Sequence, residues 1–537
     1  MQRTLFLLFC LLPFCGLCQI TVHFFVDSKL ENTLQFDDTL AVKNFVENRK
    51  LQWLDEGHFF AGIDSTLQRE AGTYVYLHRG KRLRAAISGV KSGDIGKSIS
   101  KKLSEYNNSG FPFATILIDS IDLDDGVLTG ELSIRPGPEI RYDSAFFFES
   151  VKTSHHYIYH LLDVVPGAVF KESTYQQIEE RVKRAPFLLL KRPTDIGFSQ
   201  NLATIFLDLE EQTTNSFQGV LGLQQNQEGG TSIVGSLDFS AQNLFGAGHQ
   251  FAFSWESFAE SSQSLDLYYR HAYLLDSKIS PSVRFNLLRQ DTTFLTRETS
   301  IGINTYVGSN ISLSIEFEGS NGSLISSNVE NVSLRNLADY RRNFYQLALS
   351  KGHAASLNKL SQGIVWATSV GVGTKEVEKN TALPSSFYDS IALKTNFLRM
   401  EGKLAYQIRF GKRKTIFQHI EMGILENQQL LLNELYRVGG FTSLRGFNEK
   451  NFFASHYVLS RTEFRAFFEN SSFIYAFYDQ LLFRRNDLSE YPLGIGLGFA
   501  LETSTGQFSF ALASGNSRTQ NLSFAELRAH FGFITKF

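Results

Sequence analysis

The chain has 537 residues, enough for several domains, and a formal net charge of −2. A charge so close to zero leaves no electrostatic footprint for nucleic acid, so a nucleic-acid-binding protein is not expected. Phenylalanine is abundant with 49 residues, whereas cysteine, methionine and tryptophan occur three times each.

The N-terminus has the features of a cleaved secretory signal peptide over residues 1–18. Arg3 is a basic flank, residues 5–12 are an apolar stretch too short to span a membrane, and small residues precede a cut before Gln19. A lipoprotein signal acylated at Cys15 or Cys18 is the alternative, which the bulky residues beside these cysteines disfavour. All three cysteines lie within this signal. The mature chain is therefore expected to use neither disulfides nor thiolate chemistry.

Beyond the signal, no run of about 18 apolar residues occurs, which excludes a helical membrane protein. An exported chain of this composition can be periplasmic, secreted or an outer-membrane barrel.

The first part of the mature chain mixes helical and strand patterns and contains an internal repeat. Residues 57–63 (GHFFAGI) recur as 110–116 (GFPFATI), and residues 75–80 (VYLHRG) recur as 132–137 (LSIRPG), in the same order and at similar spacing. Each copy reads as a helix, a glycine turn, a strand and a glycine hairpin, and a third, looser copy follows. Chance similarity between short motifs is the alternative. We expect three small α+β modules, over residues 19–82, 83–138 and 139–214.

Residues 215–537 read almost entirely as strands. Apolar and polar side chains alternate with period two in residues 250–256 (QFAFSWE), 311–318 (ISLSIEFE) and 403–410 (KLAYQIRF). A soluble sandwich would also alternate. Long strands, an aromatic apolar face and a terminal Phe537 favour a membrane barrel, which must close because lipid offers no backbone partners. The length suits roughly 16 antiparallel strands.

Four motifs resemble those of one family in the same order. Residues 243–248 (NLFGAG), 443–447 (SLRGF), 461–465 (RTEFR) and 477–479 (FYD) are similar to an early barrel hairpin, a loop motif and two later strands. The family is the POTRA-domain outer-membrane barrel superfamily of BamA/TamA-type assembly and translocation factors. Leu481 stands where relatives have glycine. The resemblance implies three POTRA-like α+β modules followed by an all-β transmembrane barrel of about 16 antiparallel strands.

The resemblance also implies a position for the loop that carries Leu444, Arg445, Gly446 and Phe447. In relatives this loop starts outside the barrel and folds back into its lumen. Gly446 would allow a tight turn or a close approach to the wall, and Phe447 would pack the loop tip. An ordinary solvated Arg-Gly turn is the alternative.

A guanidinium inside a lumen needs an acceptor, ideally a carboxylate that binds it in a bidentate manner. Alternation in the strand after the motif turns Glu463 and Arg465 towards the lumen, and Asp479 lies on the following strand. We predict that Arg445 pairs with Asp479, with Glu463 as a second acceptor.

No other segment predicts catalysis or cofactor binding. Residues 93–98 (GDIGKS) lack the glycine spacing of a phosphate loop and read as the start of a helix. His155, His156 and His160 are close together, but no carboxylate or thiolate nearby completes a metal site, so a surface cluster is expected. We expect no enzyme activity, no cofactor and no metal.

These features predict an assembly or translocation factor in the bacterial outer membrane with its modules in the periplasm. Unfolded outer-membrane or secreted proteins would bind the modules and add to the seam between the first and last barrel strands. The expected seam residues are Gly219, Gly222, Phe533 and Phe537, the glycines weakening the first strand. Outer-membrane lipids and periplasmic or inner-membrane accessory proteins are the other expected partners. A secretion pore for one dedicated partner and a passive diffusion porin are the alternatives.

Overall fold

The computed structural model describes residues 20–536 apart from short gaps at 37–38, 70–71, 89, 91–92, 149–150, 226–230, 309, 326–335, 353–356, 358, 486–487, 504–505 and 524–526. The expected signal peptide and Phe537 lie outside the described residues. The chain divides into two compact units. The first contains residues up to 144, 165–176 and 196–205, and the second contains 145–164, 177–195 and 206–537.

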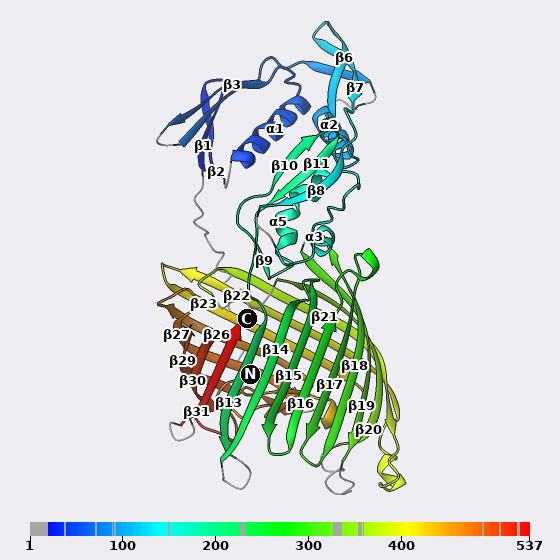
Figure 1. Cartoon of the computed structure of the whole chain (residues 1–537), viewed down its shortest axis with the longest axis vertical. Helices are drawn as coiled ribbons and strands as arrows, with labels where there is room; N and C mark the ends of the chain where they lie inside the picture. Colours follow the sequence, from blue (N-terminus) through cyan, green and yellow to red (C-terminus); the bar gives the residue numbers. More distant parts are fainter. Residues whose placement is uncertain are drawn as a thin grey trace, which may run out of the picture. The chain divides into compact units, whose positions relative to one another are not determined.

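The first sheet of the chain has the order β2-β1-β4-β3 and is accompanied by one helix (Figure 1). Its elements are β1 (Ile20–Val26), β2 (Lys29–Phe36), α1 (Thr39–Asp55), β3 (Gly62–Arg69) and β4 (Gly72–His78). Strands β1 and β4 run parallel. Alternate residues of β1, among them Val22 and Phe24, pack with Val46 and Trp53 of the helix, and this cluster is the core of the module.

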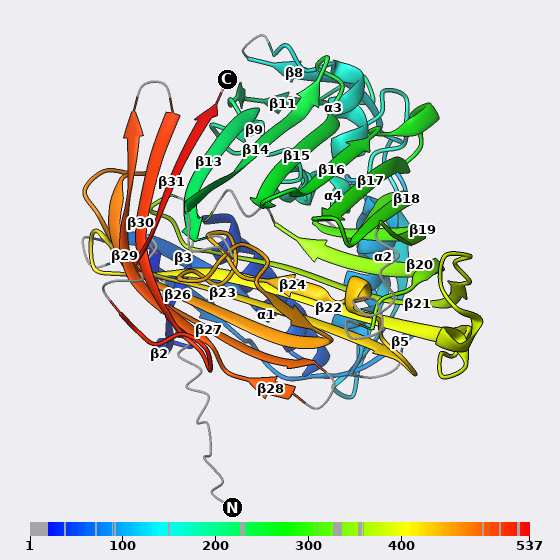
Figure 2. The same cartoon turned by 90° about the horizontal axis from the view of Figure 1, so that it is seen from below.

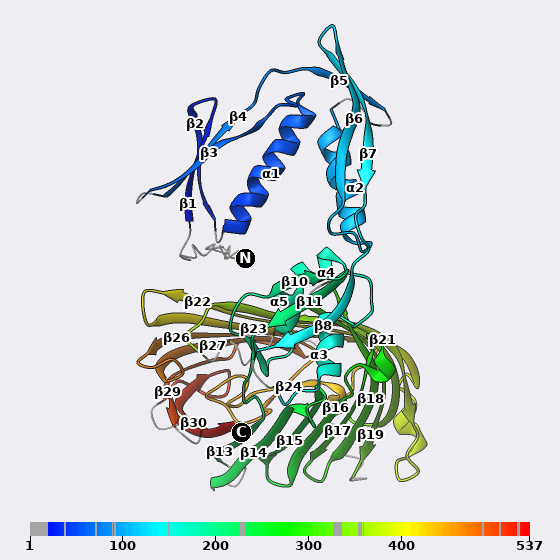
Figure 3. The same ribbon diagram turned by 45° about the horizontal axis from the view of Figure 1, so that its top comes forward.

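A second sheet, of order β5-β7-β6, follows with its own helix (Figure 3). Its elements are β5 (Arg84–Ser88), α2 (Ile95–Asn107), β6 (Thr115–Asp124) and β7 (Val127–Arg135). Residues 93–98 lie at the start of α2, as expected. The Asp55 carboxylate accepts a hydrogen bond from the Gly96 amide at 2.7 Å. A β-carbon on Gly96 would lie 2.2 Å from the Leu51 carbonyl oxygen, so this glycine serves the close approach of α1 and α2.

A third small sheet has the order β10-β11-β8, and a two-stranded pair joins β12 to β9. The elements are β8 (Arg141–Phe147), α3 (His155–Leu162), α4 (Glu172–Gln176), α5 (Ile178–Val182), β9 (Leu188–Leu190), β10 (Asp195–Ser199), β11 (Leu202–Leu207) and β12 (Leu209–Glu211). Helices α3 and α5 belong to the second compact unit, which also contains residues 206–537. Whether the three sheets are POTRA repeats with the predicted boundaries stays a prediction.

Within the described residues, sixteen long strands close into an antiparallel barrel (Figure 2). They are β13 (Ser216–Gln225), β14 (Thr231–Leu244), β15 (His249–Ala259), β16 (Ser262–Arg270), β17 (Ser280–Gln290), β18 (Phe294–Val307), β19 (Ile311–Leu324), β20 (Asp339–Lys351), β21 (Gly363–Glu378), β22 (Lys394–Phe410), β23 (Lys414–Asn427), β26 (His456–Phe467), β27 (Phe473–Arg485), β29 (Leu493–Thr503), β30 (Gly506–Asn516) and β31 (Arg528–Lys536). The short β28 (Leu488–Glu490) pairs with the end of β27. The predicted barrel and its strand number are confirmed.

The barrel wall alternates as the sequence predicts. On β19, the side chains of Ile315 and Phe317 are exposed on the outer face, while Ser314 is buried and Glu318 forms ion pairs. The last strand starts at Arg528. Among the described helices, none is long and apolar enough to cross a membrane.

Candidate functional site

The loop between β23 and β26 lies within the ring of barrel strands (Figure 2). It contains the short helix η4 (Leu432–Glu434) and the paired strands β24 (Tyr436–Val438) and β25 (Phe452–Ala454). We call residues 428–455 the lumen loop. Its tip, between β24 and β25, carries the Arg-Gly-Phe motif.

Arg445 is 1 % exposed and binds the two carboxylates that the sequence suggested. Its Nε and Nη2 donate to the two Asp479 oxygens, each at 2.7 Å, which is the bidentate geometry. Nη1 donates to Glu463 Oε1 at 2.7 Å, and the Arg445 amide donates to Asp479 at 3.2 Å. The guanidinium also lies 3.7 Å from the centre of the Phe477 ring. All of these partners come from β26 and β27, so the loop tip is fixed to one wall.

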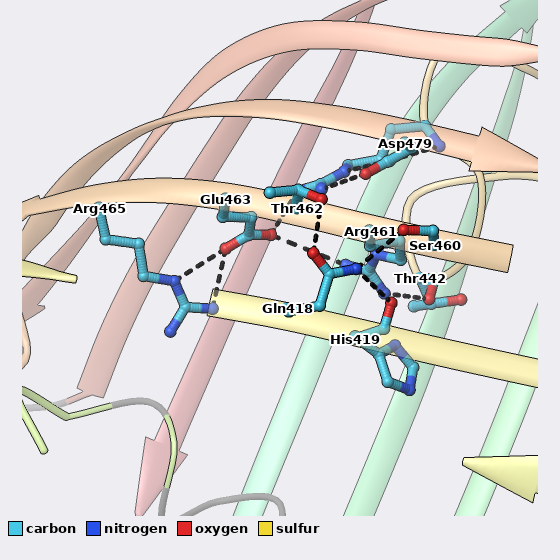
Figure 4. Close-up of polar contacts among 10 residues, drawn as sticks. Gln418, His419, Thr442, Ser460, Arg461, Thr462, Glu463, Arg465 and Asp479 are labelled. Carbon is cyan, nitrogen blue, oxygen red and sulfur yellow. Dashed lines mark hydrogen bonds and ion pairs between the residues drawn. The ribbon is translucent and has the colours of Figure 1, made fainter. Parts of the chain in front are cut away.

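Two further arginines of β26 extend this ionic cluster (Figure 4). Arg465 Nε donates to the second oxygen of Glu463 at 2.8 Å. Arg461 Nη1 donates to the Thr442 carbonyl at 2.6 Å, which ties the wall to the loop backbone. Breaking a buried pair of this kind leaves an uncompensated charge, so the cluster holds the loop in one arrangement.

Glycines of the neighbouring strands make room for the motif. A β-carbon on Gly494 of β29 would lie 1.9 Å from the Arg445 carbonyl oxygen, and one on Gly515 of β30 would lie 2.6 Å from the Phe447 ring. Gly494 and Gly515 are opposite each other in the sheet. Gly446 has a φ of +90°, and a β-carbon there would meet the Ser514 backbone at 2.7 Å. The backbone of the motif therefore approaches the wall closely at Gly494 and Gly515, where there is no side chain.

Sequence reasoning missed Gly494 and Gly515, although the alternating glycines of residues 494–498 (GIGLG) were a visible signal. It did note Leu481 in place of the glycine of relatives. That leucine is fully buried against Leu444 and Phe447 in an apolar cluster. The backbone of the motif approaches the wall most closely on the next strand, at Gly494, which is opposite Asp479.

The lumen loop also contacts strands beyond that wall. Lys450 Nζ donates to Glu256 Oε2 of β15 at 2.5 Å and to Ser264 of β16 at 2.7 Å. Arg528 of β31 donates to the Gly446 carbonyl at 3.1 Å. The loop therefore crosses the lumen.

The seam between the first and last strands is closed by backbone pairing. Residues 216–222 of β13 pair with 530–536 of β31, which places Gly219 opposite Phe533 and Gly222 opposite His530. Phe533 is 40 % exposed on the outer face. A cavity of 170 Å³ lies on the inner side, between strands β13 to β15, the loop tip and His530.

The hairpin motif of residues 243–248 lies against the segment before α3. Asn243 Nδ2 donates to Thr153 Oγ1 at 2.9 Å, and the Ser154 amide donates to the Gly246 carbonyl at 2.8 Å. A β-carbon on Gly248 would lie 1.9 Å from the Tyr157 ring, so only glycine fits there. Burial raises the pKa of Tyr157 well above its ordinary value, so its hydroxyl stays protonated.

No protein-family model matches this chain, and no curated protein matches its sequence. Solved structures do match its shape. CdiB from Acinetobacter baumannii has a TM-score of 0.56 and 12 % identity, over 97 % of this chain and 90 % of that one. CdiB from Escherichia coli has a TM-score of 0.54 and 13 % identity, over 93 % of this chain and 99 % of that one.

The chain therefore shares its fold with these CdiB structures. A structure of BamA from Haemophilus ducreyi lacking POTRA domains 1-3 is also similar, with a TM-score of 0.43 and 12 % identity over 83 % of this chain and 94 % of that one. The resemblance predicted from the sequence motifs is confirmed for the fold. The Arg445 cluster and the β13–β31 seam lie in the same closed sheet, and they are the candidate site.

Proposed function

We propose that this protein is an Omp85-type assembly or translocation factor of the bacterial outer membrane. In this proposal its N-terminal modules are POTRA-like, lie in the periplasm and bind unfolded outer-membrane or secreted proteins. The β13–β31 seam then templates the insertion of a client strand. Outer-membrane lipids surround the barrel, and periplasmic or inner-membrane proteins assist delivery. The proposal assigns no catalytic step, cofactor or nucleic acid to the chain.

The outer face of the barrel supports a membrane location. Residues such as Ile301, Ile315, Tyr345 and Val372 expose from 58 % to 64 % of their surface there. A lipid environment removes the cost of such an apolar surface. It also demands that every backbone group be paired within the sheet, which a closed barrel achieves.

The seam is the observation that carries the proposal. Opening a barrel exposes two edge strands whose unpaired backbone groups can accept a new strand. Among the described residues, seven residue pairs join β13 to β31, as many as join β30 to β31, whereas β13 forms ten pairs with β14. Gly219 and Gly222 add no side-chain packing to this short ladder. The cavity behind it means that the lumen loop does not fill the space beneath the seam.

The second module offers a further sheet edge. Strand β5 is at the edge of its sheet, and a hollow of 710 Å³ runs along Ala85, Ala86, Ile87 and Ser88. An extended peptide could pair with this edge by β-augmentation while the hollow accepts its side chains. This supports client binding by the modules.

The passive porin is disfavoured because the lumen loop crosses the barrel and contacts β15, β16 and β31 as well as β26 and β27. A secretion pore for one exported partner remains the alternative, since the superfamily contains both assembly and secretion factors.

Depletion of the protein from its own cell tests the proposal. We expect a general loss of folded barrel proteins from the outer membrane, measured by quantitative proteomics of that membrane. Loss of a single secreted protein, with other barrels unchanged, would establish the dedicated pore instead. A change in small-solute uptake alone would support a porin and contradict the proposal.

A further inference from the structure

Two histidines of helix α3 lie on one side of that helix. His156 and His160 are four residues apart, a spacing that brings side chains to the same face. The centres of their rings are 4.6 Å apart. Imidazole nitrogens at this helical spacing are common ligands of transition metals. The nearest carboxylate in the chain, that of Asp163, forms ion pairs with Lys278 and Arg181 instead.

The turn between β16 and β17 supplies the missing carboxylate. Asp276, in the short helix η1 (Leu274–Asp276), places its Oδ1 2.7 Å from His156 Nε2 and 3.8 Å from His160 Nε2. The three ligand atoms all lie within 4.8 Å of one another. Zinc binds imidazole nitrogen and carboxylate oxygen at about 2.0–2.2 Å, so its donors are roughly 3.3 Å apart in a tetrahedral site. Small side-chain movements would give that separation.

We propose that His156, His160 and Asp276 form a binding site for a divalent transition-metal ion, with Zn²⁺ as the best match. Two imidazoles and one carboxylate are a donor set that this ion accepts. The side chains of His156 and Asp276 are 60 % and 69 % exposed, so water can reach the fourth position and the ion can exchange. The proposal does not depend on the function of the barrel.

The turn is held in place by contacts other than the three ligands. Lys278 Nζ lies 2.8 Å from Asp163 Oδ1, at the C-terminal end of α3. The ring of Tyr273 lies 5.8 Å from that of His160 and 5.5 Å from that of Tyr157. These contacts hold the Asp276 carboxylate beside the histidines before an ion binds. Less conformational entropy is then lost when the ion binds.

The backbone of the turn is also unusual. Tyr273, Leu275 and Asp276 have φ values of +48°, +51° and +60°, in the left-handed region that most residues avoid. Such strain is characteristic of sites where the surrounding structure holds a side chain in a required position. Here it turns Asp276 back towards α3.

Two nearby cations are paired with a different carboxylate. Both Lys278 and Arg181 form ion pairs with Asp163, the second at 3.4 Å. Among the described residues, the ion pairs of Asp276 are those with the two histidines. Its charge is therefore available to a metal. A bound ion would join α3 to a barrel turn within the same compact unit, and would stiffen that junction.

Zinc titration of the purified, chelator-stripped full-length protein in detergent tests the site. We expect one Zn²⁺ per chain in the unsubstituted protein. His160→Ala and Asp276→Asn should each weaken binding by at least the roughly 10–100-fold that loss of an outer-shell partner costs. Circular dichroism of each variant would check that the barrel remains folded. In a second measurement, bound zinc should slow hydrogen exchange in residues 272–279 of the unsubstituted protein and leave it unchanged in Asp276→Asn.

His155→Gln is the matched control. His155 is on the same helix, but its ring stacks on Phe147 at 4.5 Å and is not one of the three ligands. This variant should bind zinc as the unsubstituted protein does. Equal zinc affinity in all folded variants, or no stoichiometric binding to the unsubstituted protein, would overturn the proposal. In that case the contact is an ordinary histidine–carboxylate ion pair.

Discussion

The wall that holds Arg445 and the seam between β13 and β31 belong to one sheet, yet they are built differently. At the wall, buried ion pairs, close contacts with Gly494 and Gly515, and an apolar cluster fix the lumen loop to β26, β27, β29 and β30. At the seam, seven pairs of described residues join two strands above a cavity of 170 Å³. The wall has one favoured arrangement, while the seam is held mainly by its backbone ladder. This difference suggests which part stays rigid and which part opens.

Removing the guanidinium should have the largest effect. Arg445→Ala leaves Asp479 and Glu463 buried without their main cation, so we expect a loss of about 3–5 kcal/mol in the free energy of unfolding. Urea unfolding of the folded protein in detergent would measure it. Arg341→Ala is the control, because that arginine and Glu378 form an exposed pair worth less than about 1 kcal/mol. Equal losses in the two variants would contradict a special role for the wall.

Alanine substitutions of one glycine in each region should change the stability of the barrel by different amounts. Gly494→Ala puts a β-carbon 1.9 Å from the Arg445 carbonyl and should cost about 1–3 kcal/mol through overpacking. At the seam, Gly219→Ala meets its nearest atom, on Leu237, at 3.8 Å. It should be neutral or stabilise the barrel by up to about 1 kcal/mol, because it restricts the unfolded chain. Thermal unfolding of both variants makes the comparison. A larger loss of stability in Gly219→Ala than in Gly494→Ala would contradict the difference between the seam and the wall.

A smaller loss of stability than that of Gly494→Ala is expected from the contact on the opposite side of the lumen. Lys450 and Glu256 are each 22 % exposed, so Lys450→Ala should cost about 1 kcal/mol. The lumen loop should become somewhat more accessible to protease while the Arg445 cluster remains intact. Lys412→Ala, in an exposed turn, should leave protease accessibility unchanged. Release of the whole loop by Lys450→Ala would mean that the anchor is not at the wall.

The pairing of Arg445 with Asp479 and Glu463 could be inferred from the sequence because strand alternation assigns each side chain to a face. A buried guanidinium then needs a carboxylate on that face. The barrel could be inferred for the same reason, since apolar and polar residues alternate along its strands and aromatic residues such as Phe317 occur on the outer face.

Other features depend on register between distant segments, which no local pattern reveals. Gly494 matters because β29 places it opposite Asp479, and Asp276 matters because a turn far along the chain brings it to His156. The carboxylate of Asp276 is 120 positions after that histidine, which explains why the sequence alone predicted a surface cluster there.

Locking the seam tests the central claim most directly. Gly219→Cys combined with Phe533→Cys joins directly opposite residues, and Val370→Cys with Met400→Cys does the same between β21 and β22 as a control. The native cysteines all lie in the expected signal peptide, so the background is clean. Each pair would be oxidised in cells that depend on it, and folded outer-membrane barrels would be quantified with and without reductant. The account predicts that the locked seam abolishes their assembly, that reductant restores it, and that the control pair has no effect. Full assembly with a completely cross-linked seam would contradict it.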